Sequence, residues 1–100
     1  MLNGYLVMET EAGQEVMKLN KESILLGRMP GVVDYVLKSN VVWRVHARIE
    51  NIDDNYYVTD LGSKNGTYLD GARLVANEKY KLENNSNIKL ANINLYFNKQ

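Results

Sequence analysis

The chain has no cysteine, one histidine and one proline in 100 residues. Without cysteine it forms no disulfide, zinc–thiolate site, iron–sulfur cluster or thiol nucleophile. A single histidine, His46, excludes a metal site made from several histidines of one chain, and we expect neither a metal nor an organic cofactor. The formal net charge is zero, from 12 basic and 12 acidic residues. We therefore expect no binding to nucleic acid, which needs a basic field.

Long apolar stretches are also absent. Apolar runs are short, as in Ile24-Leu25-Leu26, whereas a membrane-spanning helix needs about 20 apolar residues. The first ten residues contain neither the basic region nor the apolar core of a secretory signal. We therefore expect no membrane span. The absence of cysteine and of a signal peptide favours a cytoplasmic location.

The residues that are present indicate one globular domain rich in short strands. The length of 100 residues suits a single domain, and 45% hydrophobic residues is too high for a disordered chain. Apolar and polar residues alternate with period two in several short segments, which is typical of half-buried strands. We predict strands over residues 5–10, 15–19, 23–27, 35–37, 47–52, 56–59, 88–90 and 93–97.

Turn residues separate these segments. Asn65-Gly66 and Asp70-Gly71 are the strongest hairpin dipeptides in the chain, because both central residues of a type I′ turn have positive φ. Asp53-Asp54-Asn55 predicts a further hairpin turn. Helical spacing of apolar residues is not sustained over ten residues anywhere. The pattern predicts an all-β sandwich or barrel.

Catalytic motifs are missing from the sequence. The chain has four serines but no G-x-S-x-G turn, and no phosphate-binding G-x-x-x-x-G-K-[ST] loop. Asp53 and Asp54 fall at a hairpin tip, and calcium binding by these residues with Asp60 lacks the regular ligand spacing of a calcium loop. We expect that the protein is not an enzyme. A small enzyme or metal-binding β-domain remains the alternative from another class.

Several loop motifs occur in a fixed order on this all-β chain. Each alone is explained by a glycine turn, a surface arginine or a buried histidine. Together they resemble the forkhead-associated (FHA) domain family over nearly the whole chain, from about Tyr5 to Phe97. The motifs are Gly27-Arg28, Arg44-x-His46-Ala47-Arg48-Ile49, Asp60-Leu61-Gly62-Ser63-x-Asn65-Gly66-Thr67, and Gly71. The resemblance implies an eleven-stranded β-sandwich of two antiparallel or mixed sheets, with its first and last strands adjacent. It also implies a site for phosphothreonine peptides in the loops at one end.

The resemblance implies roles for five binding residues. Arg28 contacts the phosphate, and arginine suits this because its rigid fork of donors matches phosphate oxygens. Arg44 stands where a second basic contact is common, and Lys64 adds positive charge. Asn65 holds the peptide main chain, since its amide both donates and accepts hydrogen bonds. Trp43 occupies the position of the usual phosphate-binding serine in the pattern Ser-x-x-His.

Three further residues support the loops in this family. His46 ties the loops together without touching the ligand, and Gly27 and Gly66 supply backbone conformations that other residues resist. The departure at Trp43 leaves two functions open. The first is a phosphothreonine-dependent peptide-binding module for signalling, weakened by Trp43. The alternative is a phosphate-independent interaction or scaffold domain in which Trp43 serves as an apolar anchor.

The organisation of the protein follows from the same resemblance. We expect residues 1–100 to form one FHA domain of a larger protein, because such modules normally lie beside other domains. In isolation we expect a monomer whose partner is a phosphothreonine-containing protein or peptide.

Overall fold

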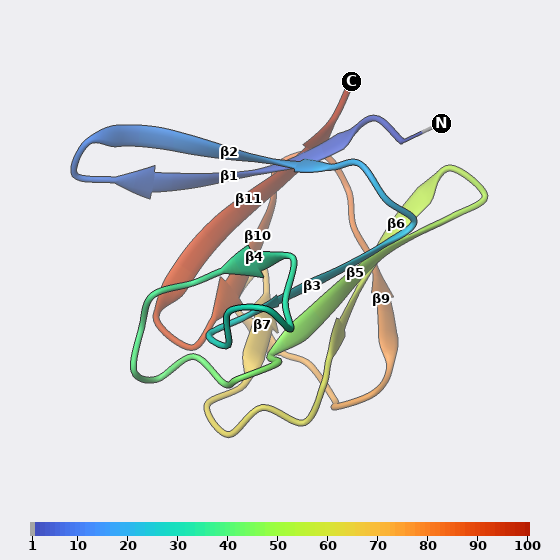
Figure 1. Cartoon of the computed structure of the whole chain (residues 1–100). Helices are drawn as coiled ribbons and strands as arrows, with labels where there is room; N and C mark the ends of the chain where they lie inside the picture. Colours follow the sequence, from blue (N-terminus) through green and yellow to red (C-terminus); the bar gives the residue numbers. More distant parts are fainter. Residues whose placement is uncertain (1) are drawn as a thin grey trace.

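The computed structural model describes residues 2–100, which form two β-sheets packed face to face with no helix among them (Figure 1). This arrangement confirms the predicted sandwich of eleven strands. The strands are β1 (Gly4–Thr10), β2 (Gly13–Leu19), β3 (Ser23–Gly27), β4 (Tyr35–Val36), β5 (Ala47–Ile52), β6 (Asn55–Asp60), β7 (Thr67–Leu69), β8 (Ala72–Arg73), β9 (Lys79–Lys81), β10 (Ser86–Leu90) and β11 (Ile93–Lys99).

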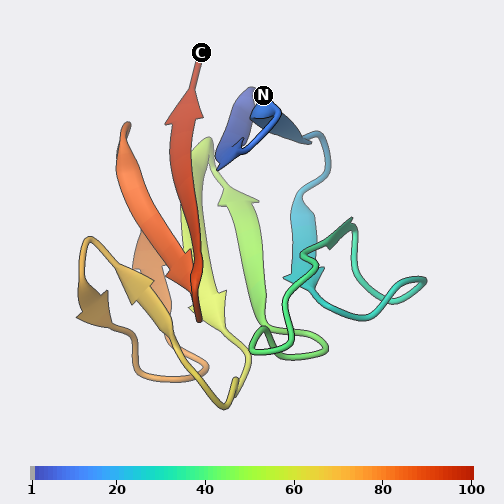
Figure 2. The ribbon, with the colours of Figure 1, turned by 90° about the vertical axis from the view of Figure 1, so that its left-hand side faces the viewer.

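One sheet is antiparallel throughout and the other is mixed. The six-stranded sheet has the order β2-β1-β11-β10-β7-β8, and the five-stranded sheet has the order β4-β3-β5-β6-β9 with a parallel pair, β3 and β4. The first strand pairs with the last, so the two termini lie together at one end. Loops 37–46 and 61–66 lie at the opposite end (Figure 2).

The core lies between the sheets and is filled by alternate strand residues. Burying one such side chain contributes about 1.5–3 kcal/mol. Tyr56 also carries a polar group into this core, where its hydroxyl accepts the Gly4 N–H at 2.8 Å and its ring lies 5.1 Å from that of Phe97. Fully buried residues include Leu6, Ile88, Leu95 and Phe97 from the six-stranded sheet, and Ile24, Leu26, Ile49 and Val58 from the five-stranded sheet.

Two of the three predicted hairpin turns are confirmed. Asp70 and Gly71 have φ values of 49° and 88° and join β7 to β8, and Asp53 and Asp54 have φ values of 51° and 66° and join β5 to β6. The prediction for Asn65-Gly66 is wrong. Only Gly66 of that pair has a positive φ, and the flanking strands β6 and β7 belong to different sheets. The dipeptide lies in a loop that crosses from one sheet to the other.

Three short strands, β7, β8 and β9, were not predicted from the sequence. They have only two or three residues each, too few to show a period of two. β9 also carries two lysines at a sheet edge, where charge protects against pairing with other chains.

The three aspartates considered for calcium do not converge. Asp53 and Asp54 lie at the β5–β6 turn and Asp60 lies at the other end of β6. Within residues 2–100 no group of three potential metal ligands is close enough to hold an ion. The same part of the chain contains no helix with the length and hydropathy that a membrane crossing requires.

Candidate functional site

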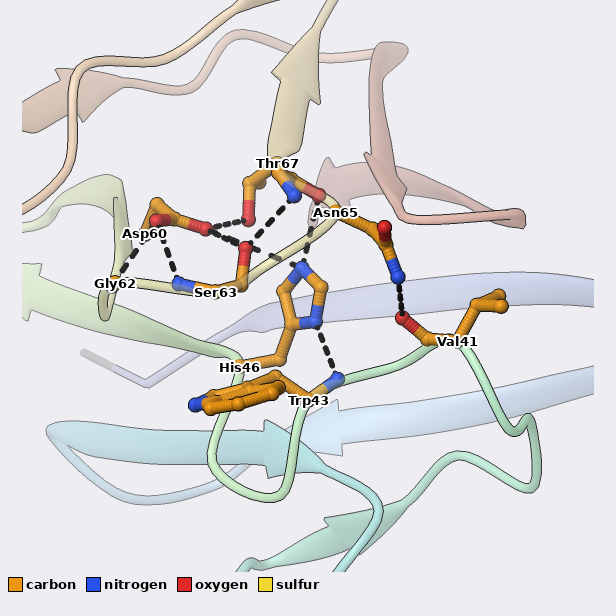
Figure 3. A network of polar contacts seen from close by, with 9 residues as sticks. Val41, Trp43, His46, Asp60, Gly62, Ser63, Asn65 and Thr67 are labelled. Atoms are coloured by element: carbon orange, nitrogen blue, oxygen red, sulfur yellow. Dashed lines mark hydrogen bonds and ion pairs between the residues drawn. The ribbon is translucent and has the colours of Figure 1, made fainter.

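Loop 61–66 takes its shape from one buried carboxylate. Asp60 is 4% exposed, and its Oδ2 accepts the backbone N–H groups of Gly62 at 3.0 Å and Ser63 at 3.1 Å. Its Oδ1 accepts the hydroxyls of Ser63 at 2.6 Å and Thr67 at 2.7 Å. Ser63 Oγ in turn accepts the Gly66 N–H at 3.0 Å. An aspartate that bonds the next two or three residues fixes a turn, so this loop is held from inside (Figure 3).

His46 connects this loop to loop 37–46. It is fully buried, its Nδ1 accepts the Trp43 N–H at 2.9 Å, and its Nε2 lies 2.9 Å from the Gly66 carbonyl oxygen. Because one partner is a donor and the other an acceptor, the ring is neutral with its proton on Nε2. The Gly66 carbonyl also accepts the Ala91 N–H at 3.0 Å. One histidine therefore joins two loops at the point where the β10–β11 turn meets them (Figure 3).

The burial of His46 affects its titration. Desolvation lowers the pKa of the imidazole below its usual value, and the Gly66 carbonyl and the Asp60 carboxylate offset part of that effect. The Asp60 Oδ1 lies 3.9 Å from His46 Nε2. The neutral form is the one that the two hydrogen bonds require, so burial and bonding favour the same state.

Gly27 allows β3 to approach loop 37–46 closely. A Cβ at this position would lie 2.2 Å from the Arg44 carbonyl oxygen, which no other residue tolerates. The backbone N–H of Arg28 donates to the carbonyls of Trp43 at 3.1 Å and Arg44 at 3.0 Å. Gly66 meets a second requirement, because its φ of 83° is in the region that disfavours side chains.

Arg28 and Asn65 hold consecutive carbonyl groups of the same loop. Arg28 Nε donates to the Val42 carbonyl at 3.1 Å, and Asn65 Nδ2 donates to the Val41 carbonyl at 2.8 Å. Both side chains are exposed. Among residues 2–100, the terminal guanidinium nitrogens of Arg28 and the Asn65 Oδ1 bond to no other group. These atoms are available for further hydrogen bonds.

Trp43, Arg44 and Lys64 complete the exposed part of the site. The Trp43 indole is 37% exposed, and the Arg44 guanidinium carbon lies 5.9 Å from its ring centroid, within the range of a cation–π contact. Figure 3 shows the indole extending away from the Asn65 side chain. Lys64 is exposed beside Asn65.

The charges at this end differ from those elsewhere. Within residues 2–100, Arg28, Arg44 and Lys64 have no acidic partner. On the five-stranded sheet, Arg48 and Lys79 lie 3.2 and 3.7 Å from the same oxygen of Glu50. The candidate site is therefore a positive patch on a chain of zero net charge.

The structure brings together most of the residues singled out from the sequence. Arg28, Trp43, Arg44 and Asn65 meet around loop 37–46, and His46, Gly27 and Gly66 lie beneath them. Sequence reasoning missed the part played by Asp60, Ser63, Thr67 and Ala91. The first three belong to the quoted motif Asp60–Thr67, in which an acidic residue followed by hydroxyl residues at short spacing is the indication of a side-chain-held turn.

The family model for the FHA domain matches residues 24–91. The chain belongs to this family. A solved structure, the FHA domain of the CT664 protein from Chlamydia trachomatis, has a TM-score of 0.88 at 25% identity, with 98% of each chain covered. The MEK1 FHA domain in complex with a phosphothreonine peptide of HOP1 has a TM-score of 0.85 at 23% identity, covering 100% of this chain and 99% of that one, and so shares the fold.

A curated relative is much longer than the region that it shares with this chain. Protein FraH from Nostoc sp. is 37% identical over 65 residues, which are 63% of this chain. The match covers 22% of FraH, so the chain corresponds to about a fifth of that relative.

Proposed function

We propose that this domain binds peptides and proteins that carry phosphothreonine, with no catalytic role. The observation that carries this proposal is that Arg28, Arg44 and Lys64, three exposed cations in the loops at one end of a neutral chain, have no acidic partner among residues 2–100. A phosphate bears roughly −1.5 to −2 charges and strong acceptor oxygens. Such a group binds best where cations are held in place and not already neutralised.

In this proposal Arg28 is the main phosphate contact. Its Nε bond to the Val42 carbonyl orients the guanidinium and leaves the terminal nitrogens for the ligand, so little conformational entropy is lost on binding. Arg44 and Lys64 add charge at the edges of the site. His46, Gly27 and Gly66 act indirectly, by fixing the loops that carry these side chains.

Asn65 is proposed to hold the peptide backbone. Its side-chain amide donates one N–H to the Val41 carbonyl, which leaves the second N–H and the side-chain carbonyl oxygen for a ligand. These two groups match the C=O and N–H of one extended residue. Recognition of the main chain beside the phosphate adds affinity without selecting a particular side chain.

The proposal also includes an effect of Trp43 on the affinity for phosphate. Its side chain has no hydroxyl to donate to the phosphate, and its backbone N–H is already bonded to His46 Nδ1. We therefore propose that phosphate binding is weaker than it would be with serine here, and that it depends more on the surrounding cations. Such binding is sensitive to salt, since charges near the surface are screened.

The direct test is titration calorimetry with matched peptides that differ only in phosphorylation of one threonine. We expect binding of the phosphorylated form and none of the unphosphorylated form, with affinity falling as salt rises. Equal binding of the two forms would contradict the proposal. A phosphoserine version of the same peptide measures how far the threonine methyl matters.

One observation favours a second function, a phosphate-independent interaction domain. Trp43 is a large aromatic side chain that remains 37% exposed with Arg44 against its ring, and tryptophan and arginine are frequent at the centre of protein interfaces. Equal affinity for both peptide forms, lost on Trp43→Ala, would support this alternative.

The wider setting follows from the family. We propose that residues 1–100 are one FHA domain of a larger cytoplasmic protein and that the isolated domain is a monomer. Equilibrium sedimentation at several concentrations tests the last point.

A further inference from the structure

Among residues 2–100 the sandwich has four edge strands, and they differ in length. β4 and β8 have two residues each and β9 has three, whereas β2 has seven, Gly13–Leu19. Very short edge strands protect a sheet against pairing with other chains. β2 lacks this protection, and in the described part of the chain no strand lies beyond it (Figure 1). It is therefore the long open edge of the molecule.

One hydrogen bond locates the free backbone groups of β2. The Tyr35 hydroxyl donates to the Lys18 carbonyl at 2.6 Å, so this carbonyl points away from β1. In an antiparallel ladder the backbone groups of successive residues point alternately toward the partner strand and away from it, so those of Val16 and Gln14 also point away. Within residues 2–100 the backbones of these two have no hydrogen bond outside the pairing with β1. The open part of the edge ends where Tyr35 covers Lys18.

The outward side chains of β2 continue an apolar row on the surface. Val16 is 55% exposed, and it pairs with Val7 of β1, which pairs in turn with Tyr96 of β11. The three lie side by side across the outer face of the six-stranded sheet. Contiguous apolar groups on a surface mark interaction sites. A strand added beyond β2 would extend this row by one residue and cover Val16.

The charges and the shape of this edge define what fits it. A hollow of about 410 Å³ opens beside Val16 and Lys18, with Leu2 and Tyr5 in its lining, and Lys18 is the one charged side chain among the described residues that line it. Within residues 2–100 neither Lys18 nor Glu15 has an ion-pair partner. Opposite charges directly across a strand pair stabilise it. A partner strand with an acid opposite Lys18 and a base opposite Glu15 therefore complements both.

We propose that β2 binds an extended segment of another protein, which adds to the six-stranded sheet as a seventh strand antiparallel to β2. Addition to a sheet edge supplies main-chain hydrogen bonds for affinity and alternate side chains for specificity, and antiparallel pairing is the more stable kind. The segment carries a β-branched apolar residue opposite Val16 and an acid two positions before it, opposite Lys18. This inference goes beyond the proposed function, because the edge shares no residue with the candidate site and needs no phosphate.

The probe is an unphosphorylated peptide, acetyl-Thr-Asp-Thr-Val-Lys-Thr-amide. In the proposed register its valine lies opposite Val16, its aspartate opposite Lys18 and its lysine opposite Glu15. It is titrated into the ¹⁵N-labelled chain, and the backbone amide resonances are followed by NMR. We expect saturable shifts confined to β2 and β1. Hydrogen exchange of the Val16 amide should slow, because this N–H gains an acceptor.

Two N-methylated forms of the peptide test the strand pairing. In an antiparallel ladder the peptide valine would exchange both backbone hydrogen bonds with Val16, whereas the N–H of the next peptide residue points away from β2. Methylation of the valine nitrogen should weaken binding at least about fivefold, because a hydrogen bond is lost and the methyl group lies between the strands. Methylation of the lysine nitrogen is the matched control and should change the affinity by less than about twofold.

Lys18→Glu tests the side-chain part of the proposal. We expect it to weaken binding about two- to fivefold, as befits an exposed ion pair, and replacement of the peptide aspartate by lysine should restore the affinity. Lys89→Glu makes the same charge change on β10, on the same face of the sheet, and should leave the affinity unchanged. Both lysines are exposed, so both variants should melt at the temperature of the unaltered chain.

Four results would overturn the inference. The first two are the absence of shifts in β2 at millimolar peptide and equal weakening by the two methylated peptides. The third is a change of β2 resonances with chain concentration alone, which would mean that a second copy occupies the edge. The fourth is equal weakening in Lys18→Glu and Lys89→Glu, which would reduce the contact to overall charge. None of these measurements involves a phosphorylated peptide, so each leaves the proposed phosphothreonine binding to its own test.

Discussion

The two ends of the sandwich use charge and hydrogen bonding differently. At the end with the termini, polar groups bond to each other, as when Lys99 Nζ donates to the Asp54 carbonyl at 3.1 Å and Tyr56 accepts the Gly4 N–H. At the loop end, a buried network around Asp60 and His46 satisfies its own groups. The exposed cations above it have no acidic partner among residues 2–100.

Because of this difference, we expect different residues to determine the stability of the fold and the affinity for a ligand. The network under the loops shapes the site, and its side chains His46, Asp60 and Thr67 are buried. The cations that we propose to bind the ligand lie outside it and contribute little to folding, because exposed charges seldom do. Substitutions in the two layers should therefore have separable effects on unfolding and on affinity.

The largest effect is expected on the free energy of unfolding, from substitution of the buried Asp60. Asp60→Ala removes the acceptor for two backbone N–H groups and two hydroxyls, and each buried group left unsatisfied costs about 1–3 kcal/mol. Because the hydroxyls can turn to other partners, we expect the free energy of unfolding to fall by about 3–4 kcal/mol in urea denaturation.

Asp60→Asn is the matched variant. Its carbonyl oxygen can accept the two N–H groups while its amide donates to the hydroxyl oxygens, so we expect less than half the loss. A change below about 1 kcal/mol in Asp60→Ala would show that the carboxylate does not hold the loop.

The next largest effect is expected from substitution of Arg28, which should change the affinity for the peptide and not the stability of the fold. We expect Arg28→Ala to weaken binding of a phosphothreonine peptide at least about a hundredfold, or 2.8 kcal/mol. The transition midpoint should move little, since surface substitutions change stability by about 0.5 kcal/mol or less. Titration calorimetry and thermal unfolding measure the two effects.

Arg48→Ala controls for net charge, because Arg48 lies on the face of the five-stranded sheet beside Glu50. Equal weakening in Arg48→Ala and Arg28→Ala would mean that the overall charge of the chain, and not a contact from Arg28, drives binding.

Much of this site could be predicted from the sequence, including the loop-supporting role of His46, but not the role of Asp60. Residues such as Leu95 and Phe97 alternate with polar ones, so the strands were visible in the period of hydrophobicity. The motifs with Arg28, His46 and Asn65 indicated which loops matter. In the sequence, Asp60 is only a polar residue after a predicted strand. Its bonds to Gly62, Ser63 and Thr67 depend on how the chain folds back, so its role in shaping the loop could not be predicted.

A smaller effect is expected at Trp43. A serine hydroxyl that donates to a charged oxygen contributes roughly 1.5–3 kcal/mol, and each 1.4 kcal/mol is about tenfold in affinity. We therefore expect Trp43→Ser to tighten binding of phosphothreonine peptides by at least about tenfold and to reduce its dependence on salt. Titration calorimetry at two salt concentrations measures both.

Trp43→Ala separates removal of the indole from addition of the hydroxyl. Equal gains in Trp43→Ala and Trp43→Ser would show that the indole blocks the site and that the hydroxyl adds nothing. Weaker binding in Trp43→Ser would make the indole part of the recognition surface.

The smallest effect concerns pH and arises from His46. Burial lowers the pKa of this imidazole in the folded chain, so the unfolded chain binds a proton more readily than the folded one. The stabilisation is fully present above the unfolded pKa, which is about 6.5. It declines as the pH falls below that value, and the decline stops below the folded pKa. His46 is the single histidine, and side-chain carboxylates in unfolded chains titrate near pH 4. We therefore expect the loss of stability in urea denaturation between about pH 6.5 and 5 to come from this residue.

His46→Ala should be less stable at pH 7.5, because the Trp43 N–H and the Gly66 carbonyl lose their shared partner. Its stability should change little between about pH 6.5 and 5. An equal pH dependence in His46→Ala and the unaltered chain would show that another group titrates there, and an unchanged melting temperature at pH 7.5 would show that His46 does not join the loops.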